Sequence, residues 1–189
     1  MRNKGLYWLA AFVALALTLG PRAVAQNPTP VKLAGAINDY NSVALGSYEM
    51  RGAWSLKVRG NSGTADFTAA LNMEHSDLGI INGATSRNAH THHIKVVGGT
   101  VLATGNGFRV TGPAIITANG QYPPPFGPNS TLQIDVTGST GDNAVPYSNI
   151  QLTFINNADG TSSDAVKHFG SQVINGVVRS VKPAEADDH

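Results

Sequence analysis

The sequence predicts a single all-β domain, an antiparallel β-sandwich or β-barrel of about eight strands. Apolar and polar residues alternate along several short runs, whereas the spacing of an amphipathic helix is hard to find. Clusters of Gly, Asn, Ser and Pro separate the runs, as turns do between antiparallel strands. The chain has no cysteine, so a core, a bound metal or self-association must hold the domain together instead of disulfides.

The N-terminus has the three parts of a cleavable signal peptide. Residues 1–4 are basic, residues 6–19 form an apolar run without charge, and Ala-Val-Ala at 23–25 supplies the small residues that a signal peptidase requires. We therefore expect residues 1–25 to be removed and the protein to be exported, to a periplasmic or extracellular location. A spanning helix needs about 20 apolar residues, and the run at 6–19 is shorter than this. No second run of that kind follows, so no membrane span is expected after cleavage.

The predicted mature chain is one secreted all-β domain at residues 26–181, followed by a disordered acidic tail at 182–189. An extended arm is expected at Gln26–Val31. The leader contains three of the 13 basic residues, so the mature chain has 10 against 12 acidic residues and its net charge changes from +1 to −2. The remaining basic residues are scattered, which argues against a nucleic-acid partner.

The clearest predicted element is a hairpin. Trp54, Leu56 and Val58 share one face, residues 60–63 supply a turn, and the alternation resumes from Ala65 to Met73. Further strands are predicted, in chain order, at Ala89–Val97, Val101–Ala103, Gly107–Thr117, Thr131–Thr137, Asn149–Phe154 and Val173–Val181.

A turn, a surface loop and a helical turn are predicted between these strands. Gly98 and Gly99 are interpreted as a turn between two strands. Residues 122–128, Tyr-Pro-Pro-Pro-Phe-Gly-Pro, are predicted to form a stiff surface loop because proline has no backbone N–H to donate. The aromatic residues of this loop form either a binding edge or a cap on the core. A single helical turn is expected at residues 164–169.

One short motif concentrates chemistry, the run Ala-His-Thr-His-His-Ile that contains His90 and His92. Residues two apart on a strand point to the same side, so two imidazoles would lie roughly 6 to 7 Å apart, a spacing that suits one transition-metal ion such as zinc or copper. His93 would point to the other side. A metal site needs a third ligand, and His75 and His168 are the candidates, with Glu74 and Asp77 as acidic alternatives.

Two functional hypotheses remain open at this point. In the first, the domain is a non-catalytic binding or structural module whose proline-rich loop and strand-end histidines recognise a small molecule or a surface partner. In the second, the histidines make a metal-binding protein or a metalloenzyme. A further possibility is that Arg87, Glu74 and Asp77 share one rim of the domain with the histidines, as a general acid/base pair or an anion-binding spot. Nucleophile motifs are absent. The sequence does not decide whether the protein is an enzyme.

Overall fold

The computed structural model describes residues 29–184 except 44–45, 61, 84–85, 120–125, 128–129 and 140–144. The predicted signal peptide, half of the predicted arm (26–28), most of the proline-rich loop (122–125 and 128) and residues 185–189 therefore lie outside the described residues. Among the described residues, no helix is long and apolar enough to cross a membrane.

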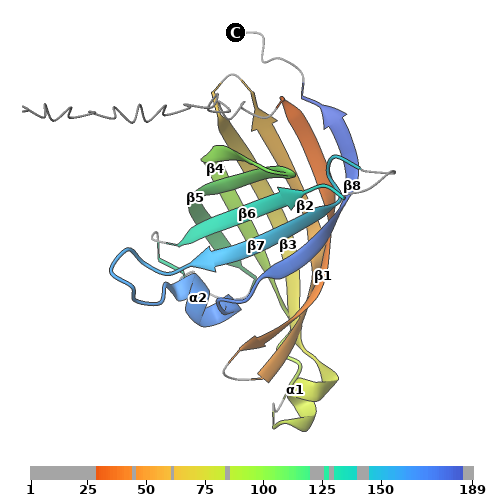
Figure 1. Ribbon diagram of the computed structural model, residues 1–189. Coiled ribbons are helices and arrows are strands. Elements are labelled where there is room, and N and C mark those ends of the chain that lie inside the picture. Colours follow the sequence, from red (N-terminus) through yellow and green to blue (C-terminus); the bar gives the residue numbers. More distant parts are fainter. Residues whose placement is uncertain are drawn as a thin grey trace, which may run out of the picture.

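The described chain forms a closed barrel in which eight strands follow one another in sequence order (Figure 1). Every neighbouring pair is antiparallel, including the first and last strands, which close the barrel. The strands are β1 (Val31–Val43), β2 (Gly46–Arg59), β3 (Thr64–His75), β4 (His90–Thr104), β5 (Gly107–Ala118), β6 (Thr131–Thr137), β7 (Asn149–Ile155) and β8 (Ile174–Pro183). The all-β prediction is confirmed, and the choice between sandwich and barrel is decided in favour of the barrel.

The barrel interior is filled by the apolar residues of the period-two pattern. Burial alternates along β3, β5, β6 and β7, as expected when one face of each strand is dry. The largest fully buried side chains belong to Phe67, Phe108, Phe169, Leu33, Ile37, Met50, Leu56, Leu71, Met73, Ile94, Leu132 and Ile134. These side chains belong to one contiguous core, so the barrel interior is packed with side chains.

The sequence pattern missed β1 and the first half of β2. Residues 34–36 of β1 are Ala-Gly-Ala, which are too small to give a clear alternation of apolar and polar side chains. At the other end of the chain, β8 continues past Val181 through Lys182 to Pro183, into the segment predicted as a tail. β8 is extended there because Lys182 pairs with Lys32 of β1 in the seam that closes the barrel.

The prediction of a turn at Gly98 and Gly99 is wrong, because both residues lie inside β4. The register of the β4–β5 pair shifts between Val96 and Thr100, which identifies a β-bulge. Gly98 has a φ of +65°, a backbone conformation that glycine adopts without strain, and its N–H donates to Asp66 Oδ1 at 2.9 Å. The glycines therefore bend one long strand instead of separating two short ones.

Two short helices interrupt the strands. Helix α1 (Asp77–Ile81) was not predicted, and Ser76 caps its N-terminus by accepting a hydrogen bond from Gly79 N at 3.2 Å. Helix α2 (Asp164–Phe169) is the predicted helical turn, capped by the Ser163 hydroxyl and ended by Gly170, which has a φ of +83°. α2 contacts β1 and β7 and lies at one end of the barrel (Figure 1).

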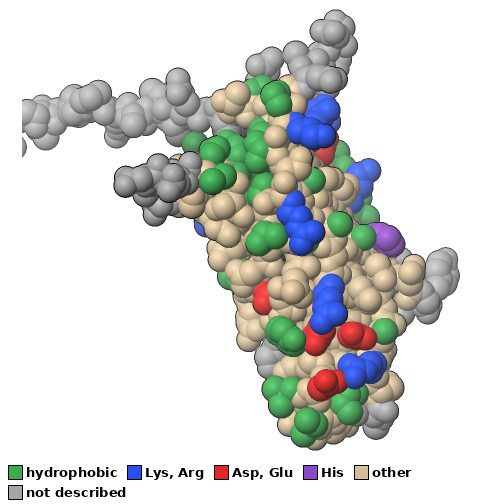
Figure 2. Space-filling model, turned by 90° about the vertical axis from the view of Figure 1, so that its right-hand side faces the viewer, with side chains coloured by type: hydrophobic (Ala, Val, Ile, Leu, Met, Phe, Trp, Pro, Cys, Tyr) green, Lys and Arg blue, Asp and Glu red, His purple; other side chains and the backbone are tan. Residues whose placement is uncertain are grey.

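Charges on the outside of the barrel are dispersed. Figure 2 shows Lys and Arg side chains spaced along one face, with Asp and Glu side chains near those at the lower end. Cross-strand ion pairs join Arg59 to Asp66 and Arg109 to Asp135. On the face shown, the basic residues do not merge into a single patch.

Candidate metal centre

Strand β4 carries both histidines of the His-x-His motif to the barrel interior. His92 is fully buried, in register with Leu71 of β3, and His90 is half-buried. His93, between the inward-facing residues, is exposed on the outer surface. The alternation of a strand thus places the two imidazoles on one side, with ring centroids 4.7 Å apart.

Helix α2 brings a third histidine to this pair. The capped turn directs Ala165, Val166 and Phe169 into the core, and His168 approaches the cluster from the same helix. His168 Nε2 lies 2.9 Å from His92 Nε2 and 3.4 Å from His90 Nε2. One ring nitrogen from each of the three histidines lies within 4.8 Å of the other two.

The orientation of the His90 ring is set by a backbone carbonyl. Asn88 O lies 2.6 Å from His90 Nδ1, and because a carbonyl can only accept, Nδ1 carries the proton. The lone pair of His90 is therefore on Nε2, the nitrogen that faces His168. Asn88 has a φ of +46°, the only positive φ outside glycine among the described residues. A hydrogen bond of this kind orients the histidine ligands in metalloproteins.

The environment keeps the buried imidazoles neutral. Burial lowers the pKa of His92 to about 3, and repulsion from His168 and His90 adds to this effect. Burial, followed by repulsion from His90, lowers the pKa of His168 to about 4. Both rings are therefore uncharged near neutral pH, the form in which an imidazole nitrogen can bind a metal ion.

Acidification is expected to destabilise the metal-free protein. Unfolding returns His92 and His168 to water, where their pKa is 6.5, so between about pH 6.5 and about pH 4 the unfolded chain binds protons that the folded chain does not. The free energy of unfolding should fall as the pH falls through this window, by at most about 1.4 kcal/mol per pH unit for each histidine.

Urea unfolding in the presence of a chelator, repeated across this pH window, measures the effect. The variant His168→Ala serves as a control and should show a smaller slope, because only His92 then contributes to it. A free energy of unfolding that stays constant or rises on acidification would contradict the prediction.

Aromatic side chains form the apolar wall of the cluster. The Phe169 ring centroid lies 4.8 Å from that of His92 and 5.0 Å from that of His168. Phe126 contacts the same two histidines at 5.4 and 5.2 Å. Phe154 stacks on Phe169 at 4.5 Å and continues the wall into the core. Phe126 packs against the core, in agreement with the predicted capping role of the loop's aromatic residues. The sequence gave no sign that these rings surround the histidines.

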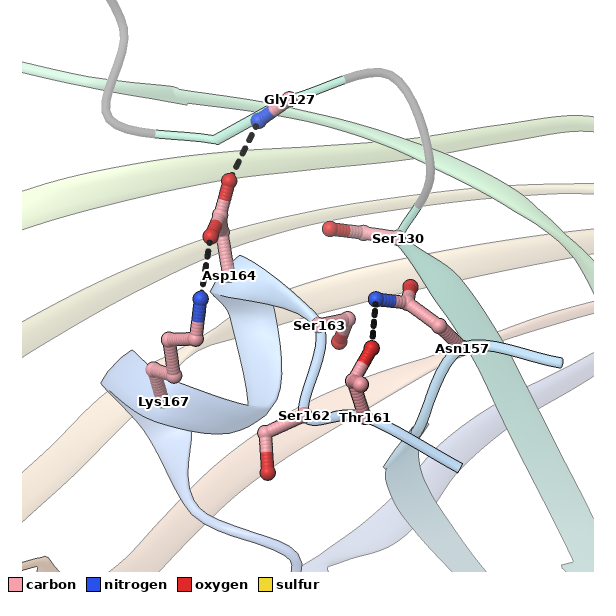
Figure 3. Close-up of a pocket in the computed structure, with 8 residues that line it drawn as sticks. All are labelled: Gly127, Ser130, Asn157, Thr161, Ser162, Ser163, Asp164 and Lys167. Atoms are coloured by element: carbon pink, nitrogen blue, oxygen red, sulfur yellow. Dashed lines mark hydrogen bonds and ion pairs between the residues drawn. The ribbon is translucent and has the colours of Figure 1, made fainter. Parts of the chain in front are cut away.

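A polar network on the outer side of α2 holds the Phe126 segment in place (Figure 3). Gly127 N donates to Asp164 Oδ2 at 3.3 Å, and Lys167 Nζ donates to Asp164 Oδ1 at 3.2 Å. The hydrogen bond from Lys167 and that from the Gly127 amide lower the pKa of Asp164. The cavity beside this network, of about 220 Å³, lies between α2, the loop that precedes it and the segment before β6, and most of its lining residues have polar side chains.

The structure does not bring His75 into the cluster. Its ring is buried and packs on Tyr48 with centroids 4.0 Å apart, and Tyr48 in turn contacts the edge of His90 at 6.4 Å. Since Tyr48 contacts both His75 and His90, it lies between His75 and the cluster. The pairing of β2 with β3 places Tyr48 directly opposite His75. Of the proposed ligands, only His90, His92 and His168 converge.

The predicted acid/base rim is also separate from the cluster. Arg87 pairs with Asp77 at 2.6 Å, and the two side chains are 55% and 84% exposed. Arg87 also donates to the backbone carbonyl of His75 at 3.4 Å. Glu74 is in register with Glu49 on β2 and takes no part in the histidine cluster. The Arg87–Asp77 pair thus lies on the surface beside α1.

The fold and the site together define the class of protein: a closed eight-stranded antiparallel β-barrel with three convergent histidines near one end. Comparisons with family models, with curated proteins and with solved structures give no match for this chain. Function must therefore be argued from the site itself.

Proposed function

We propose that this protein is an exported metal-binding β-barrel in which His90, His92 and His168 hold a zinc or copper ion. The convergence of the three ring nitrogens carries the proposal. A metal–nitrogen bond of about 2.0–2.1 Å and tetrahedral geometry put neighbouring ligand nitrogens about 3.3 Å apart. The two Nε2 separations of 2.9 and 3.4 Å around His168 are close to that value, and the His90 and His92 ligand atoms lie within 4.8 Å of each other.

The donor set supports this choice of metals. Imidazole nitrogens suit zinc and copper, and the chain has no cysteine that would favour a thiolate site. Three protein ligands leave one position of a tetrahedral ion open, which is typical of sites that bind water or a substrate.

The alternative hypothesis, a non-catalytic recognition edge, has less support. It relies on the proline-rich loop, and residues 122–125 lie outside the described residues. The described end of that loop, Phe126 and Gly127, packs against the histidine cluster and α2. This contact supports a role for Phe126 and Gly127 in covering the cluster.

Metal analysis of the purified chain tests the proposal. The chain, prepared without an affinity tag, is dialysed against zinc or copper and then against metal-free buffer, and bound metal is measured by elemental analysis. We expect about one ion per chain. His168→Ala should lose most of this metal because it removes a ligand at the edge of the cluster without disturbing a strand.

The matched control is His93→Ala, which removes the neighbouring outward-facing imidazole. It should keep the stoichiometry of the unaltered chain. Absence of stoichiometric metal in the unaltered chain, or equal metal content in His168→Ala, would refute the proposal.

A further inference from the structure

We infer that the metal-loaded site takes a small monovalent anion as its fourth ligand, with the metal bound by His90, His92 and His168. This inference rests on the proposed function and identifies the class of ligand that the open position would accept. Its physical basis is the charge of the site, which the protein ligands leave uncompensated.

The three protein donors are all neutral. An imidazole binds a metal through an unprotonated nitrogen, so a divalent ion keeps its full charge of about +2 when only histidines bind it. Among the described residues, the cluster contains no carboxylate, and the chain has no thiol. A fourth ligand with a negative charge would therefore reduce an excess of positive charge that water would leave in place.

The surroundings strengthen this electrostatic preference. Phe126 and Phe169 lie against both His92 and His168, and apolar walls screen a charge much less than water does. The acidic residue on the helix that carries His168 is Asp164, which is turned to the outer network of Lys167 and the Gly127 amide (Figure 3). Its charge is already partnered by the ammonium group of Lys167.

The exposure of the ligands indicates where the anion would bind. His92 is fully buried, whereas His90 and His168 are half-buried. Solvent therefore reaches the cluster on the side of His90 and His168.

Azide titration of the copper(II)-loaded chain tests the inference. We expect an azide-to-copper charge-transfer band that saturates at about one azide per copper. Hydroxide derived from water is an anion of the same charge that would occupy the same position. Hydroxide would then compete with azide, so the apparent affinity for azide should fall as the pH rises. This pH dependence distinguishes the added anion from hydroxide.

A charge placed in the wall tests the electrostatic cause. Phe126→Asp would put a carboxylate beside the metal, and azide affinity should fall by about tenfold or more while histidine-bound copper is retained. His93→Asp introduces the same carboxylate on the outer surface of the barrel and should leave azide affinity within about twofold, because water screens the charge there. Circular dichroism verifies that both variants are folded.

The outcomes separate the two proposals. Copper bound stoichiometrically by the histidines with no spectral response to azide would overturn this inference alone. Equal azide affinities in Phe126→Asp and the unaltered chain would also overturn it. If Phe126→Asp does not fold, the pH dependence of azide affinity decides, and an affinity that does not fall with rising pH would overturn the inference. A chain that binds no copper would overturn both proposals.

Discussion

Replacing Gly35 by alanine is expected to remove most of the stability of the barrel. A Cβ at this position would lie 1.9 Å from the carbonyl oxygen of Val177 and 2.8 Å from Cζ2 of Trp54. The first atom belongs to the backbone of β8 and the second to a buried indole, so neither can move away at low cost. Gly35 lies at the register shift of the seam that closes the barrel. We expect a loss of about 4 kcal/mol or more in the free energy of unfolding.

The same substitution at Gly105 provides the control. A Cβ at Gly105 meets no atom within 4 Å, because this residue lies in the turn between β4 and β5. Gly105→Ala should change the free energy of unfolding by less than about 0.5 kcal/mol. Urea unfolding followed by circular dichroism compares the two variants. A Gly35→Ala protein as stable as Gly105→Ala would show that β1 and β8 are not packed as described.

Zinc is expected to raise the melting temperature of the unaltered chain by roughly 10 °C when its free concentration exceeds the dissociation constant about a thousandfold. The shift arises because the folded chain binds the ion and the unfolded chain does not present the three histidines together. The variant His92→Phe should lose the shift, since it removes the buried ligand.

In metal-free buffer, the same variant should melt at least as high as the unaltered chain. Among the described residues, His92 Nδ1 is buried without a hydrogen bond of normal geometry, although the Thr117 backbone interacts with the ring, and burying a poorly satisfied polar atom costs stability. The neighbouring rings of Phe126 and Phe169 would pack against a phenylalanine. Differential scanning calorimetry with zinc and with chelator measures both effects.

A zinc-dependent shift that persists in His92→Phe would place the metal elsewhere in the molecule. Because phenylalanine is larger than histidine, His168→Ala at the half-buried position provides a second test. It should lose the zinc-dependent shift while leaving His92 itself in place on β4.

Strands with large alternating side chains were predictable from the sequence, and strands made of small residues were not. Thr131–Thr137 was predicted with the same bounds as β6, because Leu132, Ile134 and Val136 mark its buried face clearly. β1 was missed, although it pairs with two strands and closes the barrel. Within its Ala-Gly-Ala segment, Gly35 makes room for Trp54 of β2, and this reason for a small residue becomes visible only when the strands are paired.

The histidine cluster was predictable in part, again because side chains alternate along a strand. The shared side of His90 and His92 follows from the geometry of one strand, so the motif alone indicated it. The choice of His168 over His75 as the third ligand could not be read from spacing, because His168 Nε2 meets His92 Nε2 across 76 residues of chain. Tyr48, placed by the pairing of β2 with β3, keeps His75 apart.

The sequence by itself determined the all-β class and the face on which most side chains of the predicted strands lie, because the alternation of a strand is a property of its local backbone. Only the tertiary structure decided that the sheet closes into a barrel, that Gly98 bends a strand and that α2 delivers His168 to β4. These features depend on the register between strands and on contacts between residues far apart in the chain, which no local pattern encodes.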